Sequence, residues 1–213
     1  MLTDDDIKGG SYMSKRIITI SREFGSGGRS IGRELAQRLG WKFYDKELVN
    51  AVALETGFAE EYIEENSEHA PSASMFAYAF TQHGASGLMR GMSITDFLWV
   101  AQREVILKIA EEGNCVIVGR NADHILKDRE DVLNVFIHAD KDYRAERIVR
   151  LYGESEKPPQ QRLNEKDKKR AVNYRHYTSK EWGDSRNYHL SLDSGMLGEE
   201  TCVEIIEALV KKD

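Results

Sequence analysis

The sequence lacks a long apolar run, and no stretch approaches the ~20 residues that a membrane-spanning helix requires. It also lacks an excess of basic residues, because 36 Asp and Glu outnumber 30 Lys and Arg and give a formal charge of −6. A mildly acidic chain is a poor candidate for broad electrostatic binding to nucleic acid or to an anionic membrane. We therefore expect neither partner for this protein.

Cysteine and proline are also scarce, with two and three residues respectively among 213. Cys115 and Cys202 each lie in an apolar stretch, which predicts buried thiols, and no Cys-x-x-Cys spacing suggests a zinc site. Residues 1–14 are polar and contain no apolar core of signal-peptide length, so we expect a disordered extension and a cytoplasmic protein. Residues 15–213 are expected to form a single domain.

Strand and helix patterns alternate along the chain. Short β-branched or apolar runs predict strands at residues 16–20, 41–44, 115–118, 132–137 and 188–192. Helical spacing and stop signals predict helices at residues 30–39, 45–56, 93–112, 140–151, 163–178 and 198–210. Residues 68–92 show little periodicity and are expected to form an irregular insertion. This alternation predicts an α/β fold with a mainly parallel sheet.

A glycine-rich segment, residues 21–30, joins the first strand to the first helix and reads Ser-Arg-Glu-Phe-Gly-Ser-Gly-Gly-Arg-Ser. The usual phosphate-loop pattern is G-x-x-x-x-G-K-[ST], from which this segment departs at Glu23 and Arg29. The physical requirements are still met, because three glycines can turn backbone N–H groups inward and a helix N-terminus follows them. We predict a phosphate cradle formed by Gly25, Ser26, Gly27, Gly28, Arg29 and Ser30, with Arg29 supplying the cation and Ser30 a magnesium ligand.

Two other interpretations of this segment compete with phosphate binding. A glycine-rich strand-to-helix turn can occur with no ligand at all. A dinucleotide-binding loop would read G-x-G-x-x-G and would place an acidic residue at the end of the next strand, where Asp45 lies. Asp45 also fits the N-cap of the second helix.

Four segments together resemble one known family. They begin at Ile20 (Ile-Ser-Arg-Glu-Phe-Gly-Ser-Gly-Gly-Arg-Ser-Ile-Gly), Phe43 (Phe-Tyr-Asp-Lys), Val116 (Val-Ile-Val-Gly-Arg-Asn-Ala-Asp) and Tyr174 (Tyr-Arg-His-Tyr-Thr-Ser-Lys-Glu-Trp-Gly-Asp-Ser-Arg-Asn-Tyr). These segments resemble the cytidylate-kinase-like family, and the similarity extends from about residue 16 to 210. The resemblance implies a P-loop nucleoside-monophosphate kinase fold with a five-stranded parallel core flanked by helices.

The resemblance also implies particular ligands and site residues. ATP with Mg²⁺ would donate a phosphoryl group, most simply to CMP or dCMP, between a mobile monophosphate-binding region at 58–98 and a lid at 151–170. Arg120 would clamp the acceptor phosphate, although the family's Asp-Gly-Arg-Asp here reads Val-Gly-Arg-Asn and has lost both acids. Asp167 and Arg170 match a late Asp-x-x-Arg element, and Asp45 begins the monophosphate pocket.

Phosphoryl transfer requires in-line positioning and positive charge on the equatorial oxygens. We expect Arg29, Arg147 and Arg150 to be the catalytic cations. The alternative for Arg144, Arg147 and Arg150 is a solvated stripe on one helix, since they recur three residues apart.

The sequence is compatible with three other functions. These are a kinase for another small-molecule acceptor, a nucleotide-binding regulator that has lost turnover, and an NAD(P)-linked enzyme. The lost acids beside Arg120 motivate the other kinase and the regulator, and the replacement of the loop lysine by Arg29 is a further motive for the regulator. The alternating aromatic residues at 76–80 are compatible with a homodimer contact or with a place in the core.

Overall fold

The structure is a computed structural model that describes residues 15–58, 60, 63 and 93–211. The expected extension at 1–14 and the expected insertion at 68–92 lie outside the described residues, as do the aromatic residues at 76–80.

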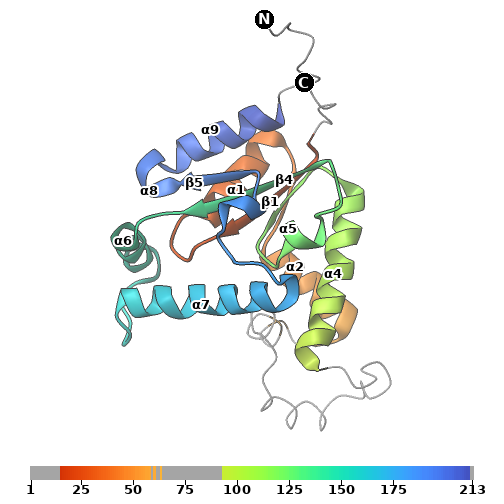
Figure 1. The fold of residues 1–213 in the computed structure, drawn as a ribbon, viewed down its shortest axis with the longest axis horizontal. Helices are drawn as coiled ribbons and strands as arrows, with labels where there is room; N and C mark the ends of the chain where they lie inside the picture. Colours follow the sequence, from red (N-terminus) through yellow and green to blue (C-terminus); the bar gives the residue numbers. More distant parts are fainter. Residues whose placement is uncertain (1–14, 59, 61–62, 64–92, 212–213) are drawn as a thin grey trace, which may run out of the picture.

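Five parallel strands form the centre of the molecule (Figure 1). Their order is β2-β3-β1-β4-β5, and they span Ile17–Arg22 (β1), Lys42–Tyr44 (β2), Cys115–Val118 (β3), Val132–His138 (β4) and Leu190–Asp193 (β5). The middle strands are rich in Ile and Val and are almost entirely buried, because both faces of the sheet are covered. The expected five-stranded parallel sheet is confirmed.

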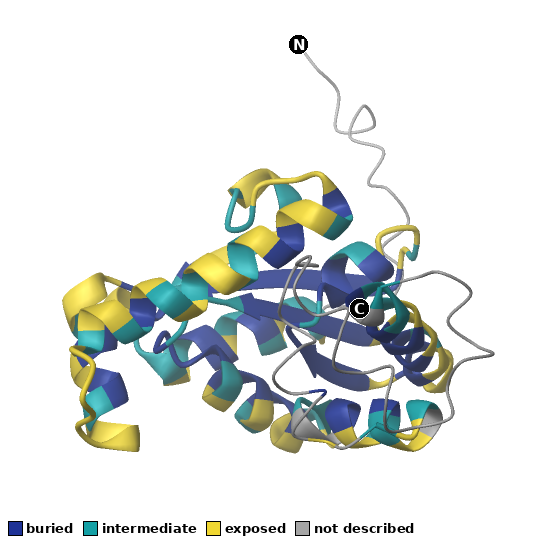
Figure 2. Ribbon diagram, turned by 90° about the horizontal axis from the view of Figure 1, so that it is seen from below, coloured by how far each residue is buried: buried dark blue, intermediate teal, exposed yellow. Residues whose placement is uncertain are grey.

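Helices cover the two faces of the sheet as separate layers. One face packs against α1 (Gly28–Leu39) and α9 (Glu199–Val210), and the other against α2 (Lys46–Thr56), α4 (Ile94–Glu112) and α5 (Ala122–Ile125). Figure 2 shows the strands as a buried slab between partly exposed helices. Among the described residues, no helix is both long and apolar enough to cross a membrane.

The chain then forms α6 (Lys141–Tyr152) and the long α7 (Pro159–Thr178), followed by η4 (Ser185–Asn187) and α8 (Ser194–Leu197). The prediction that the second of these helices begins at residue 163 was wrong by one turn. Pro159 stands at its first position, where the missing N–H of proline is harmless and its fixed φ favours the helix. The four-residue helices α5 and α8 were not predicted, because they are too short to show periodicity.

Two helix starts had been predicted from capping residues. At α4, the Asp96 N–H donates to Ser93 Oγ at 3.1 Å, as the Ser-x-x-Asp pattern predicted. At α2, Asp45 occupies the N-cap position, but its side chain makes no capping hydrogen bond. The capping role proposed for the Asp45 carboxylate was therefore wrong, and its oxygen is used elsewhere.

The sheet order places a topological switch point at β1, which lies between β3 and β4. Ligands of open α/β sheets bind beyond the carboxyl ends of the strands at such a point. The glycine-rich loop follows β1, and the segments after β2 and β3 end at the same edge. Helix α7 reaches this edge through hydrogen bonds to Arg22, Phe24 and Asn121.

Candidate active site

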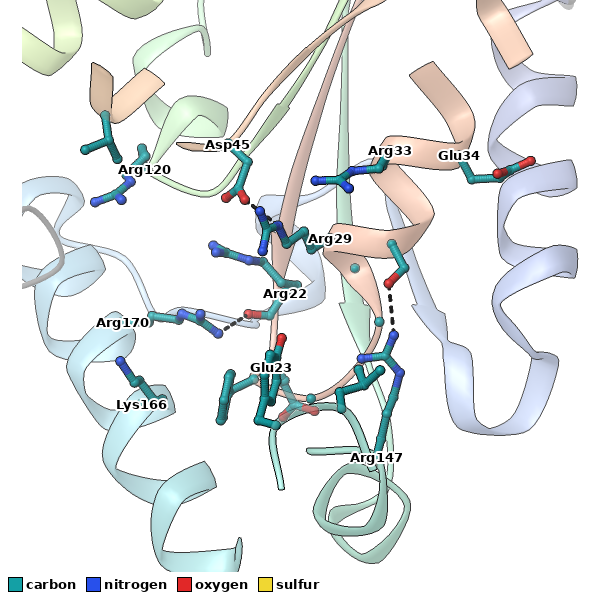
Figure 3. A pocket seen from close by; sticks show the side chains of 18 of the residues that line it. Arg22, Glu23, Arg29, Arg33, Glu34, Asp45, Arg120, Arg147, Lys166 and Arg170 are labelled. Carbon is teal, nitrogen blue, oxygen red and sulfur yellow. Dashed lines mark hydrogen bonds and ion pairs between the residues drawn. The ribbon is translucent and has the colours of Figure 1, made fainter. Parts of the chain in front are cut away.

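A cavity of about 530 Å³ opens at the carboxyl edge of the sheet, above the glycine-rich loop (Figure 3). We call it the main cavity. Seven basic side chains line it, together with three acidic ones: Arg22, Arg29, Arg33, Arg120, Arg147, Lys166 and Arg170, against Glu23, Glu34 and Asp45. The difference, seven minus three, gives the lining a formal charge of +4 in a chain whose net charge is −6. This local excess of positive charge suits an anionic ligand.

The glycine-rich loop has the backbone shape of an anion cradle. Gly25 and Gly27 both adopt φ +85, a conformation that L side chains rarely take. A Cβ at Gly25 would also lie 2.9 Å from the Arg144 carbonyl oxygen, and one at Gly28 would lie 2.6 Å from Arg22 Cβ. Helix α1 begins at Gly28 with no side-chain cap, so its first N–H groups and its dipole face the cavity.

These residues fit the phosphates of a nucleotide, and Ser30 fits a magnesium ligand. Its hydroxyl is exposed on the first turn of α1 and lines the cavity. Within the described part of the chain, no group of three His, Cys, Asp or Glu side chains is arranged to hold a metal ion. Mg²⁺ bound through one side chain and substrate phosphates is a usual arrangement, since this ion retains several waters.

Ser26 stands apart from the rest of the predicted cradle. Its side chain is buried beneath the loop, where Oγ donates to the carbonyl oxygens of Glu23 and Ile137. The Ser194 Oγ reaches the Ser26 carbonyl from the other side at 2.5 Å. Ser26 does not line the main cavity, and its N–H donates to the Glu23 carbonyl at 3.3 Å, so its place in the phosphate cradle stays a prediction.

Arg144 fastens the loop to helices α6 and α7. This buried guanidinium donates to the carbonyl oxygens of Ala139 and Phe24 and pairs with Asp167 at 2.7 Å. Its Nε also lies 3.2 Å from Glu23 Oε2. Burial raises the pKa of the Glu23 carboxyl above its ordinary value, although the Arg144 charge and the Ala139 N–H oppose this.

The three arginines of α6 take three different positions. Arg147 is buried, and its Nη2 donates to Ser30 Oγ at 3.0 Å and contacts Glu199 Oε1 at 2.7 Å. Arg144 holds the loop, as described above. Arg150 is exposed and does not line the main cavity. The interpretation of these residues as one solvated stripe is therefore wrong for Arg144 and Arg147.

The structure joins two residues that had been predicted for different ligands. Arg29 was expected to face the donor phosphates and Asp45 the acceptor, yet Arg29 Nε lies 2.5 Å from Asp45 Oδ2. Both line the main cavity, on the side of β2 (Figure 3). The ion pair directs Arg29 toward Asp45, the residue that follows β2.

Arg120 lies in a turn of unusual backbone geometry after β3. Gly119, Arg120 and Asn121 have φ values of +76, +59 and +54. Side-chain contacts maintain this turn, since Gln102 Nε2 donates to the Arg120 carbonyl at 3.3 Å and Asn121 Nδ2 donates to Asn173 Oδ1 at 2.9 Å. Residues held in such conformations cluster at ligand-binding sites, and Arg120 lines the main cavity.

Asp167 and Arg170 sit on adjacent turns of α7 but are used differently. Asp167 accepts the Phe24 N–H at 2.7 Å, pairs with Arg144, and does not line the main cavity. Arg170 lines the cavity, and its Nη1 donates to the Arg22 carbonyl at 3.2 Å. The structure therefore brings Arg170 to the predicted acceptor site and places Asp167 beneath the loop.

Several residues of this region were missed by sequence reasoning. Arg22 and Phe24 lie within the quoted glycine-rich segment and could have been found there, whereas Arg33, Tyr152 and Lys166 reach the cavity only through folding. Asp123 is a further case, because it is buried and accepts hydrogen bonds from Tyr174 Oη at 2.7 Å and from Ser21 Oγ at 3.4 Å. Burial raises the pKa of the Asp123 carboxyl, and these hydrogen bonds act in the opposite direction.

Comparisons with known proteins agree with this architecture. The model of a family described as the cytidylate kinase-like family matches residues 17–196. A solved structure of an uncharacterized protein from Eubacterium ventriosum is 27% identical with a TM-score of 0.69, covering 93% of this chain and 100% of that one. A search of curated proteins returned no match.

Two further solved structures show the same fold. Shikimate kinase from Acinetobacter baumannii, in complex with shikimate, has a TM-score of 0.54 at 16% identity and covers 95% of this chain and 98% of its own. A gluconokinase from Sinorhizobium meliloti has a TM-score of 0.52 at 17% identity, with 92% and 91% covered. At these identities the similarity concerns the P-loop kinase fold alone.

Proposed function

This chain belongs to the cytidylate kinase-like family, and from that premise we propose that it is an ATP-dependent phosphotransferase. We propose further that it transfers the γ-phosphoryl group of ATP to a nucleoside monophosphate, with CMP or dCMP as the first candidates. The family match and the glycine cradle support a kinase over an NAD(P)-linked enzyme.

The observation that carries this proposal is the charge of the main cavity around its glycine cradle. Its lining has a formal charge of +4. A phosphate monoester carries roughly two negative charges near neutral pH, and ATP with its magnesium ion carries a similar net charge. Two such ligands together balance the lining. An acceptor with one carboxylate or none would leave part of this charge without a counterpart.

On the donor side, the backbone N–H groups of Gly25, Gly27 and Gly28 would bind the phosphates of ATP, and Ser30 would hold Mg²⁺. The bound ion would supply positive charge that neutralises part of the phosphate charge. Arg147 would serve as a catalytic cation, since it already reaches Ser30 Oγ. Arg150 stays a predicted catalytic residue, although in this structure it lies on the exposed side of α6.

On the acceptor side, Asp45 after β2, Arg120 after β3 and Arg170 of α7 line the main cavity and would bind the nucleoside monophosphate. Arg29 lies between the two sides, where it could contact the transferring group. Asp167 stays a predicted acceptor residue. It could serve in that role only if its contacts with Phe24 and Arg144 were exchanged for substrate.

The reaction itself asks little covalent chemistry of the protein. An oxygen of the acceptor phosphate would attack the γ-phosphorus of ATP in line with the leaving ADP oxygen, forming a diphosphate product and ADP. The arginines would stabilise the charge on the equatorial oxygens, and exclusion of water would limit hydrolysis of ATP.

A coupled ADP-release assay with Mg-ATP tests the proposal directly. The acceptors would be a panel of nucleoside monophosphates with shikimate and gluconate beside them, and thermal-shift curves would be run in parallel. Turnover on CMP or dCMP supports the proposal. Turnover only on a hydroxyl acceptor supports another small-molecule kinase, and a thermal shift with ATP but no turnover on any acceptor supports a regulator. No shift with ATP would contradict the assignment of the cradle.

A further inference from the structure

Arg22, the last residue of β1, passes through a space left by two glycines. A Cβ at Gly28 would lie 2.6 Å from Arg22 Cβ, and a Cβ at Gly119 would overlap the Arg22 guanidinium at Nη1. The stem of Arg22 therefore crosses Gly28, and its guanidinium lies against Gly119. Any larger residue at either position would displace this side chain, so the two glycines are matched to Arg22.

Three arginines from three distant segments meet beside this packing. Arg22 comes from β1, Arg120 from the turn after β3, and Arg170 from α7, and all three line the main cavity. All three also line a small hollow bordered by Asn121 and Asn173. Figure 3 shows Arg120 and Arg170 on the same side of Arg22, with the Arg170 guanidinium directed toward the Arg22 carbonyl. We call these three residues the arginine cluster.

The arginine cluster is held in place by the backbone contacts of its members. Arg170 Nη1 donates to the Arg22 carbonyl at 3.2 Å, and Gln102 holds the Arg120 carbonyl. Guanidinium groups bind phosphate oxygens in pairs, so a phosphate monoester is the anion that several such groups recognise best.

The position of the arginine cluster assigns it to the acceptor side of the main cavity and not to the donor side. Arg22 lies against Gly119, at the end of β3, and so on the side where Arg120 enters the cavity. On the donor side, Arg147 of α6 contacts both Ser30 of α1 and Glu199 of α9. The two groups of residues thus lie on opposite sides of the loop.

We propose that Arg22 is an acceptor-binding residue that grips the acceptor phosphate together with Arg120 and Arg170, and that Gly28 and Gly119 leave the space that its side chain occupies. This inference rests on the proposed function, because it assumes that the acceptor carries a phosphate.

Calorimetric binding to the full chain tests the role of Arg22. Arg22→Gln should weaken CMP binding by about 10-fold or more, the loss expected for charge-assisted hydrogen bonds. It should leave binding of magnesium with a non-hydrolysable ATP analogue within about twofold. Arg103→Gln, at an exposed position on α4, is the matched control and should change neither. Equal losses for both ligands, or no loss for CMP, would overturn the proposal.

A double-mutant cycle tests the role of Gly119. Gly119→Ala should reproduce the CMP loss of Arg22→Gln, because its methyl group displaces the guanidinium. Combined with Arg22→Gln, it should add little further loss, since the shorter side chain no longer meets the methyl group. Losses that multiply in the double variant would show that Gly119 acts independently and would overturn the matched-glycine part of the proposal.

Inorganic phosphate separates this inference from the proposed function. It would be titrated into protein saturated with magnesium and the ATP analogue, so that the cradle is occupied. If the wild type binds phosphate but not CMP, the proposal that the acceptor is a nucleotide is wrong. The effect of Arg22→Gln on phosphate binding then still decides the role of Arg22. If the wild type binds neither, the arginine cluster is not an acceptor-anion site and the inference fails.

Discussion

At the scale of single residues, charged side chains in this site are committed to specific neighbours. Arg29 is held by Asp45, and Arg147 by Ser30 and Glu199. Each of these contacts fixes a long, flexible side chain before any ligand arrives. Preorganisation of this kind reduces the entropy that substrate binding must otherwise lose.

Replacement of Arg29 by alanine tests the cation of the cradle. We expect Arg29→Ala to lower kcat/KM for Mg-ATP by about 100-fold or more, in line with the loss of one preorganised donor to developing charge. The melting curve should stay close to that of the wild type, because the side chain is 41% exposed. Steady-state kinetics and thermal unfolding check both points. Wild-type nucleotide affinity with an unchanged melting curve would contradict the role of Arg29.

At the scale of secondary-structure elements, α7 is the helix that joins the loop to the sheet edge. Its middle turns contact the loop through Asp167 and Arg170, and its later turns contact the segment after β3 through Asn173 and Tyr174. The glycine-rich loop is therefore supported from outside by a helix that follows it by more than a hundred residues in sequence.

Substitution of Asp167 tests this support. Asp167→Asn removes a charge partner of the buried Arg144 while Glu23 remains 3.2 Å away. We expect a loss of about 2–3 kcal/mol in the free energy of unfolding, somewhat less than for a fully unpaired buried charge. Urea unfolding measures it. Glu165 lies on the same helix as Asp167 and forms an exposed ion pair with Lys157, so Glu165→Gln is the control and should change the free energy of unfolding little. Equal effects would show that the Asp167 contact is no stronger than a surface ion pair.

The contact between α6 and α9 can be tested at the same scale. Glu199→Gln should weaken the hold on Arg147 and raise KM for Mg-ATP or lower kcat several-fold, with KM for CMP nearly unchanged, because the loss concerns the donor side. The neighbouring Glu200→Gln breaks a surface pair with Arg38 and serves as the control. Tighter ATP binding in Glu199→Gln would instead mean that this carboxylate opposes the phosphates.

At the scale of the whole molecule, charge is distributed unevenly. The chain carries −6 overall, yet the lining of the main cavity carries +4. A positive cleft in a negative protein concentrates anionic ligands at one place and disfavours anions elsewhere on the surface. The parallel sheet makes this arrangement possible, because the carboxyl ends of β1, β2 and β3 bring separate charged loops to one edge.

The salt dependence of KM for CMP measures how much the positive lining of the main cavity contributes to acceptor binding. Raising the ionic strength from about 0.1 M to about 1 M shortens the screening length from about 10 Å to about 3 Å. We expect KM for CMP to rise several-fold over this range. Cytidine, which lacks the phosphate, provides the control, and its inhibition constant should change little. Parallel changes for CMP and cytidine would show that the charged lining does not attract the acceptor.

Local patterns in the sequence predict most of the elements and the position of the cradle. Apolar β-branched runs mark β1, β3 and β4, shorter stretches with aromatic or leucine residues mark β2 and β5, and glycines followed by a helical repeat mark the loop and α1. These features depend on neighbouring residues, so they can be read without knowing the fold. The differences between the predicted and the observed elements are local as well. Helix α7 begins earlier, at Pro159, and the short helices α5 and α8 carry no periodic signal.

The partners of the charged side chains were decided only by tertiary structure. The sequence identified Arg29, Asp45, Arg120, Arg147 and Arg170 as candidates, but not that Arg29 pairs with Asp45 or that Arg147 reaches Ser30. Arginine has a long, flexible side chain whose direction depends on which segments lie beside it. Those segments are set by the strand order, in which β3 enters between β2 and β1 and carries Gly119 and Arg120 to Arg22. Such long-range neighbours leave no local pattern in a single sequence.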